Sequence, residues 1–164
     1  MMETAESRQL IAIVDDEITS AQLLAMHLQE DYDTCIATTG TEALTMIKSR
    51  KPDLILLDIM LPDISGYEIC LTLKSNKETT KIPVIFVTGL EETENEELGF
   101  EAGAADYLLK PINSQIMKVR IARILDNTMY IEFLENMMSQ RELTIDSLRQ
   151  NAKEMLERSG EKAN

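Results

Sequence analysis

The stretch that most constrains the fold runs from Asp53 to Glu68. Four consecutive apolar residues, Leu54 to Leu57, are typical of a strand that is buried on both faces, as in a parallel sheet. Asp58 follows directly, so we expect its carboxylate at the carboxyl end of that strand, where open α/β sheets bind their ligands. Ser65 and Glu68 match the capping box that opens a helix. The stretch therefore predicts a strand, an acidic residue, a loop and a capped helix.

Two residues restrict the backbone of the loop. Pro62 prevents a regular continuation of the strand because it has no amide hydrogen. Gly66 has no side chain and so permits a close approach between two backbone segments. Taken alone, an aspartate such as Asp58 is more often an ordinary turn residue at a strand end than a reactive group. The other motifs of the chain make a reactive role the better interpretation of Asp58.

Four further strands are predicted, alternating with helices. The predicted strands cover residues 10–14, 34–38, 82–87 and 106–109, and the predicted helices cover 18–30, 39–51, 65–75, 93–103 and the chain from 113 onward. The helix after residue 38 and the helix after residue 92 are each expected to open with a capping box, Thr39 with Glu42 and Thr93 with Glu96. The strand at 34–38 is more polar, as suits a sheet edge. This alternation predicts a flavodoxin-like α/β fold, a doubly wound five-stranded parallel sheet of order 2-1-3-4-5 with an extended C-terminal helix.

In that order, polar side chains from four strand ends meet at one edge of the sheet. Asp15 and Asp16 follow the first strand and Asp58 follows the third, while Thr88 and Lys110 end the fourth and fifth. Three carboxylates in one crevice repel one another unless a positive charge is present, and a hard divalent cation such as Mg²⁺ suits them. The ammonium group of lysine is a good partner for a phosphate oxygen. The set predicts phosphoryl transfer onto a carboxylate, giving an aspartyl phosphate.

Five separated motifs give residues 9–125 a resemblance to the receiver domain of two-component response regulators. The motifs are Val14–Glu17, Leu57–Pro62 with Gly66, Val87–Gly89, Asp106–Leu108 and Lys110–Pro111. The resemblance implies a signalling module that a histidine kinase or a phosphotransfer protein phosphorylates. It also implies that the chain catalyses only its own phosphotransfer and dephosphorylation.

The resemblance assigns a role to each residue of the site. Asp58 is expected to be the phosphoacceptor, and Lys110 is expected to contact the phosphoryl group. Mg²⁺ is expected to bind Asp15, Asp16, Asp58 and the backbone carbonyl of Met60.

The resemblance also implies a conformational switch. Thr88 and Tyr107 are the expected switch pair, and the Lys110–Pro111 peptide bond is expected to be cis. The departures are small: Gly89 replaces the alanine that is commoner in the family. Apolar Met60 and Leu90 occupy two positions that influence the lifetime of the phosphoryl group.

Charge divides the chain into two parts. Residues 1–111 contain 8 Lys and Arg against 21 Asp and Glu, a net charge of −13, whereas residues 112–164 contain 8 of each. The acidic part argues against non-specific binding of nucleic acid. Cys35 and Cys70 have no spacing typical of a metal site or disulfide, which favours a reducing, cytoplasmic location. Neither a signal peptide nor a membrane span is visible.

The C-terminal part reads as one long helix, because residues 113–158 contain neither Gly nor Pro. Its first third suffices to cover the sheet. A heptad seam continues beyond, interrupted by Asn127 and Arg141, and predicts a parallel coiled-coil homodimer. Two observations argue against this interpretation: the seam is not flanked by complementary charge pairs, and Leu143 lies off it. The alternative is a surface helix that frays beyond residue 140. The seam is Ile124, Asn127, Ile131, Leu134, Met138, Arg141, Ile145, Leu148, Ala152 and Met155.

We therefore expect four segments: a flexible N-terminus (1–8), a receiver domain (9–125), a helical coiled-coil extension (126–158) and a disordered tail (159–164). In the expected dimer, acidic residues of the fourth helix meet basic residues of the fifth helix of the other copy. The acidic set is Glu94, Glu97 and Glu101, and the basic set is Lys118, Arg120 and Arg123.

Three functions remain open. The first is a phosphorylation-switched module that controls a downstream output through dimer geometry. The second is an enzyme or a piece of one: the regulatory N-terminal part of a cyclic-dinucleotide phosphodiesterase or cyclase, or a phosphatase. A phosphatase of the haloacid-dehalogenase type needs an acid two residues after the nucleophile, where this chain has Met60. The third is a constitutive coiled-coil adaptor. Against it argues the intact set of site residues, Asp15, Asp16, Asp58, Thr88 and Lys110.

Overall fold

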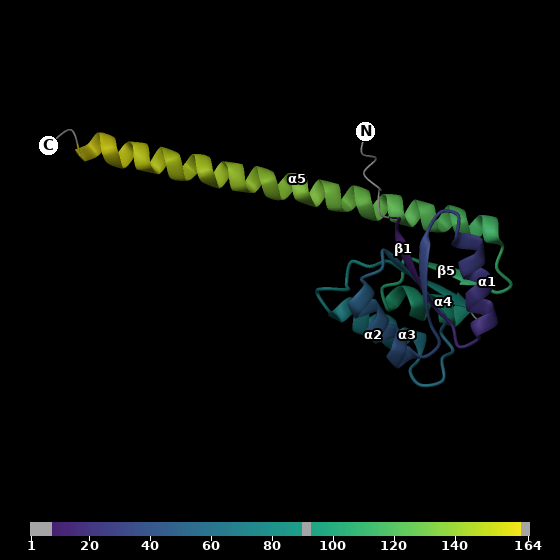
Figure 1. Ribbon diagram of the computed structural model, residues 1–164. Coiled ribbons are helices and arrows are strands. Elements are labelled where there is room, and N and C mark those ends of the chain that lie inside the picture. Colours follow the sequence, from purple (N-terminus) through teal and green to yellow (C-terminus); the bar gives the residue numbers. More distant parts are fainter. Residues whose placement is uncertain (1–7, 90–92, 162–164) are drawn as a thin grey trace. The chain divides into compact units, whose positions relative to one another are not determined.

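One parallel sheet forms the centre of the first 125 residues (Figure 1). The computed structural model describes residues 8–89 and 93–161. In the described residues the sheet order is β2-β1-β3-β4-β5, which confirms the predicted topology. The strands are β1 (Leu10–Val14), β2 (Asp33–Ala37), β3 (Leu54–Leu57), β4 (Val84–Thr88) and β5 (Asp106–Leu109).

Helices cover both faces of this sheet. They are α1 (Ile18–Leu28), α2 (Gly40–Arg50), α3 (Gly66–Ser75), α4 (Thr93–Glu101) and α5 (Ser114–Glu161). Buried side chains of α1 and of the first turns of α5 form one core, and those of α2 and α3 form the other. On the α2 and α3 face, α4 packs closely, because a Cβ at Gly99 would lie 3.0 Å from Cδ2 of Phe86.

The strands are continuous apolar runs because both of their faces are buried. Along β1, Ile11 and Ile13 belong to the core under α1 and α5, whereas Ala12 and Val14 belong to the core under α2 and α3. The four residues of β3 alternate between the two cores in the same way and are all buried. This burial anchors the strand that carries Asp58 at its end.

Some boundaries differ from the predicted ones for local reasons. β4 begins at Val84 instead of residue 82, because Pro83 has no amide to donate; its carbonyl still accepts from the amide of Ile55 at 3.0 Å. β2 begins one residue early, where Asp33 is paired with Leu10. The first helix ends at Leu28, two residues early, and turns there.

Of the three predicted capping boxes, one is complete, one is shifted by a residue and one falls outside the described side chains. Ser65 and Glu68 form a complete capping box, as predicted. At α2 the Thr39 side chain accepts from the amide of Glu42, but the Glu42 carboxylate accepts from the amide of Thr38 at 2.9 Å, so the reciprocal bond lies one residue earlier. The box predicted for Thr93 and Glu96 lies outside the described side chains.

The chain divides into two compact units, Met1–Leu125 and Asp126–Asn164. The first twelve residues of α5 belong to the first unit, where Met117, Ile121 and Ile124 are buried. Ile124 was predicted to begin the coiled-coil seam; instead it lies in the core, because the first turns of α5 cover the sheet.

The second unit is helical, and its described side chains are exposed except that of Thr128, which is half-buried. The helix continues to Glu161, past the end predicted at residue 158. The segments predicted as a flexible N-terminus and a disordered tail lie outside the described residues at 1–7 and 162–164. In the described part of the chain, no helix is long and apolar enough to span a membrane.

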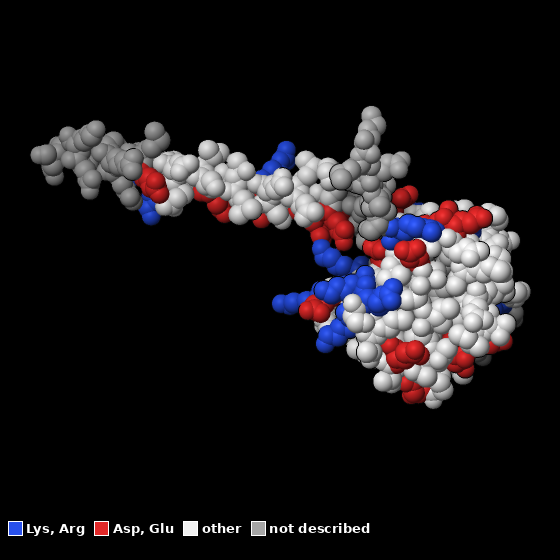
Figure 2. Space-filling model, in the orientation of Figure 1, with Lys and Arg blue, Asp and Glu red and all other residues white. Residues whose placement is uncertain are grey.

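Charge is unequal between the two units. Counted by unit, residues 1–125 have a net charge of −10 and residues 126–164 one of −3. Figure 2 shows acidic and basic side chains together on the visible face of the first unit.

Candidate phosphoacceptor site

The predicted site residues meet at the carboxyl edge of the sheet. Asp15 follows β1, Asp58 follows β3, and Lys110 follows β5. Backbone hydrogen bonds hold these positions, since the amide of Asp58 donates to the carbonyl of Val14 at 2.8 Å and the amide of Lys110 donates to the carbonyl of Thr88 at 2.9 Å. The position of the site therefore follows from the strand pairing.

Three carboxylates form an acidic cluster beside these strand ends. Ligand atoms of Asp15, Asp16 and Asp58 all lie within 4.8 Å of one another. Asp15 and Asp58 are buried, with 2% and 7% of their surface exposed, whereas Asp16 is exposed. Hard carboxylate oxygens of this kind, two fixed by burial and one open to water, fit the ligand preference of Mg²⁺.

Lys110 bridges the two buried carboxylates. Its Nζ lies 2.6 Å from Oδ2 of Asp15 and 2.8 Å from Oδ2 of Asp58. Burial lowers the pKa of the Lys110 ammonium, but the hydrogen bonds that it donates to Asp15 and Asp58 and the negative charges of these carboxylates outweigh burial and raise this pKa above its usual value. The group therefore stays charged and can hold a phosphoryl oxygen. The Lys110–Pro111 peptide bond is cis, as predicted.

The second oxygen of Asp58 is held by the loop that follows. Its Oδ1 accepts from the amide of Met60 at 3.0 Å, and the Met60 side chain is 63% exposed. Gly66 closes this loop against the strand end, with its amide donating to the carbonyl of Ile59 at 2.8 Å. A Cβ at Gly66 would lie 2.4 Å from the carbonyl oxygen of Asp58. The predicted close approach is thus confirmed, and only glycine fits it.

Two residues at the site were missed in the sequence. Ser20, in the first turn of α1, donates from its hydroxyl to Oδ2 of Asp15 at 2.8 Å. Asp63, in the loop after Asp58, accepts from the amides of Gly40 and Thr41 at 2.7 and 2.9 Å and from the Thr41 hydroxyl at 2.7 Å. These bonds, that of the Thr41 hydroxyl above all, hold the pKa of Asp63 well below its usual range.

Ser20 and Asp63 differ in whether the sequence could have indicated their role. For Ser20 the five-residue spacing from Asp15 into the first helical turn is a usable signal. For Asp63 the sequence offers none, because its partners lie more than twenty residues earlier.

The predicted switch pair is buried. Thr88 is 1% exposed at the end of β4, and Tyr107 is 7% exposed in β5. The Tyr107 ring lies against Phe86, with ring centroids 6.3 Å apart. In this structure the Tyr107 ring therefore lies inside.

Behind Tyr107, an ion cluster joins β5 to α5. Asp106 is buried, and its carboxylate oxygens lie 2.7 Å from Nη1 of Arg120 and 3.4 Å from Nη2 of Arg123. Arg120 also donates to the carbonyl of Tyr107 at 3.3 Å. The backbone of Tyr107 is therefore bonded directly to the helix that continues into the second unit.

Comparison with protein families gives a match that covers most of the first unit. Residues 11–122 match the model of the response regulator receiver domain. Among solved structures, a CheY-like response regulator receiver domain protein from Methanospirillum hungatei has a TM-score of 0.71 at 32% identity, covering 76% of this chain and 98% of that one.

Two curated relatives extend the comparison. A "Probable cyclic di-GMP phosphodiesterase" of Vibrio cholerae is 37% identical over 155 residues, which cover 94% of this chain and 33% of that protein. The "DNA-binding response regulator MtrA" of Mycobacterium tuberculosis is 37% identical over 115 residues, covering 70% of this chain and 49% of that protein. The chain therefore spans a third of the first relative and about half of the second.

Proposed function

The chain belongs to the response regulator receiver domain family, and on this premise we propose that Asp58 accepts a phosphoryl group from a histidine kinase or a phosphotransfer protein. One observation carries the proposal. Lys110, from β5, reaches Asp58 and Asp15 together, so a cation and two buried carboxylates converge at one point. That is the arrangement that phosphoryl transfer onto a carboxylate requires.

The proposed step needs little covalent chemistry from the protein. A carboxylate oxygen of Asp58 bonds to phosphorus while the bond from phosphorus to the donor nitrogen breaks, and that nitrogen keeps the electron pair. Lys110 holds one phosphoryl oxygen, and the Met60 amide keeps the Asp58 carboxylate oriented. Mg²⁺, when held by Asp15, Asp16, Asp58 and the Met60 carbonyl, supplies the remaining neutralisation of charge. The protein contributes position and charge, and no other enzymatic activity is proposed for this chain.

Phosphorylation of purified protein by acetyl phosphate tests this assignment. We expect intact-mass spectrometry to find one added phosphoryl group that requires Mg²⁺ and is absent in Asp58→Asn. Asp126→Asn, which changes an exposed aspartate of the second unit, is the matched control and should label like the wild type. Equal labelling of Asp58→Asn would overturn the assignment.

We also propose that the exposed seam of α5 joins two copies in parallel. In the described part of the second unit, Ile131, Leu134 and Met138 are 55%, 41% and 65% exposed, and Ile145 and Leu148 are 49% and 63% exposed. Large apolar side chains at heptad spacing favour pairing with an identical helix. In a parallel pair, both receivers lie at the same end of the coil.

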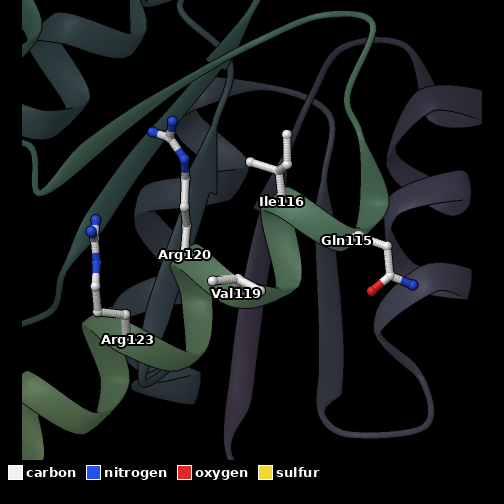
Figure 3. A pocket seen from close by; sticks show the side chains of 5 residues that line it. All are labelled: Gln115, Ile116, Val119, Arg120 and Arg123. Atoms are coloured by element: carbon white, nitrogen blue, oxygen red, sulfur yellow. The ribbon is translucent and has the colours of Figure 1, made fainter.

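A second contact between the receivers is proposed on the outer side of α5. Figure 3 shows Gln115, Ile116, Val119, Arg120 and Arg123 around an open hollow on this helix. Ile116 and Val119 are 50% and 67% exposed, so this surface has apolar area to bury.

Contacts within the chain reduce the set of ion pairs that can form between the two copies of the proposed dimer. Nζ of Lys118 lies 3.3 Å from Oδ2 of Asp31 in its own chain, so the ion pair predicted for Lys118 with the second copy is not proposed. Arg120 and Arg123 remain, but Glu97 and Glu101 of the other copy must compete with Asp106 for them. Glu94 lies outside the described side chains.

A second candidate function is the regulatory N-terminal part of a cyclic-dinucleotide phosphodiesterase or cyclase. It is favoured because the Vibrio cholerae relative matches 155 residues, so the similarity extends well into the helix beyond the receiver. Sequencing the gene around this coding region tests it; a phosphodiesterase or cyclase domain encoded downstream would support it. We place the protein in the cytoplasm because Cys35 and Cys70 are free thiols.

A further inference from the structure

Asp15 is held from two directions at the start of α1. Its Oδ1 accepts from the amide of Glu17 at 2.9 Å, and its Oδ2 accepts from the hydroxyl of Ser20 at 2.8 Å. Asp15 is 2% exposed, and Ser20 is half-buried above it. The N-cap residue and the first turn of α1 therefore hold both oxygens of this carboxylate by hydrogen bonds.

The same Oδ2 atom is also the one that Lys110 contacts. Nζ of Lys110 lies 2.6 Å away, so a hydroxyl and an ammonium share one oxygen. The two donors differ in charge. An ammonium and a divalent cation bound at the same carboxylate repel each other, whereas a neutral hydroxyl leaves the negative charge of Asp15 available. When a cation binds, Ser20 is thus the side chain able to keep its bond to Asp15.

From this geometry we infer that Ser20 is a positioning residue for Asp15: its hydroxyl fixes the carboxylate in the orientation that binds Mg²⁺ and keeps it there when Lys110 turns to the phosphoryl group. The inference rests on the proposed function of the site. Groups that hydrogen-bond a metal-ligating carboxylate typically change metal affinity about 10-fold or more. Ser20 should therefore set the Mg²⁺ affinity of the site and leave the chemistry at Asp58 unchanged.

Calorimetric titration of the unphosphorylated protein with MgCl₂ alone tests the inference. We expect Ser20→Ala to bind Mg²⁺ about 10-fold more weakly than the wild type, and Ser20→Thr, which keeps the hydroxyl, to bind within about threefold of it. Thr19→Ala is the matched control, because it removes an exposed hydroxyl from the same helical turn. Circular dichroism melts of all four proteins check that each is folded.

Phosphorylation by acetyl phosphate gives a second readout. In Ser20→Ala the half-saturating Mg²⁺ concentration should rise by the same factor, while the rate at saturating Mg²⁺ stays within about twofold of the wild type. Wild-type affinity in Ser20→Ala would overturn the role of Ser20 and leave the proposed function standing. Equal weakening in Ser20→Ala and Ser20→Thr would also overturn it, because the hydroxyl would then not be the cause. A wild-type protein that neither binds Mg²⁺ nor becomes phosphorylated would overturn both proposals.

Discussion

Among single residues, Lys110 makes the contacts with the widest consequences. It ties together two carboxylates that are far apart in the sequence, and its ammonium partly neutralises them in the unphosphorylated protein. A phosphoryl group on Asp58 changes the charges around this ammonium and draws it toward new oxygens. We expect residues near Lys110, Thr88 foremost, to respond to that change.

Thr88 is where we expect the response to begin. In Thr88→Ala, phosphorylation of Asp58 should remain within a few-fold of the wild type, because the carboxylates and Lys110 are unchanged. The conformational response should be lost, because the hydroxyl that bonds the phosphoryl oxygen is missing. Amide NMR shifts around Tyr107, compared with and without phosphorylation, measure this response.

The conservative variant sharpens the test. Thr88→Ser keeps a hydroxyl and should keep the shifts near Tyr107. Because the Tyr107 ring is already buried, with 7% exposure, we expect these shifts to report a change in its hydrogen bonding and in the Arg120 contact to its carbonyl, more than a long movement. Shifts of wild-type size in phosphorylated Thr88→Ala would contradict this route.

Among the side-chain contacts of the site, the sequence predicts some and not others. Asp15, Asp58 and Lys110 follow directly from strand ends, so the sheet order alone brings them together. The bonds of Ser20 and Asp63 depend on how a helix and a loop pack after the sheet has formed. Periodicity reports burial and carries no information about such polar contacts.

Among the elements, α5 combines two environments in one helix. Its first turns are amphipathic and bury Met117 and Ile121 on the sheet, whereas in the described second unit its large apolar side chains are exposed. The heptad pattern already begins at Ile124, which packs on the sheet, so the sequence could not show where packing on the sheet stops. Strand bounds shifted for a similar reason, since backbone pairing at Pro83 and Asp33 is not visible in side-chain patterns.

The exposed seam predicts that residues 1–164 form a dimer and that a chain ending at Asp126 is monomeric. Each fully buried large apolar side chain contributes about 1.5–3 kcal/mol, so a few seam residues suffice for association at micromolar concentration. Sedimentation velocity at tens of micromolar distinguishes the two chains by mass.

Two leucines supply a matched pair for the register. Leu134 lies on the seam and Leu143 off it, and both are exposed in the described helix, at 41% and 68%. Leu134→Glu should dissociate the dimer, whereas Leu143→Glu should leave it intact. Equal effects of the two changes would reject the heptad register. A monomeric wild type would reject the coil itself.

For the molecule as a whole, the division of charge matters most. The first unit has a net charge of −10, whereas the helical second unit has one of −3. In the proposed parallel dimer, two strongly acidic receivers would lie at one end of the coil. Their negative fields add where the receivers meet.

Association should therefore depend on ionic strength in an unusual direction. The distance over which charges act falls from about 30 Å at 0.01 M salt to about 10 Å at 0.1 M. Added NaCl screens the repulsion between receivers and leaves apolar contacts in the coil intact, so the dissociation constant of the dimer should fall several-fold over this range. An increase with salt, seen by the same sedimentation method, would instead assign the dimer to the pairs of Arg120 and Arg123 with acidic residues. If the dissociation constant instead falls with added salt, as we expect, the acidic receiver acts as an electrostatic brake on dimerisation that a higher ionic strength releases.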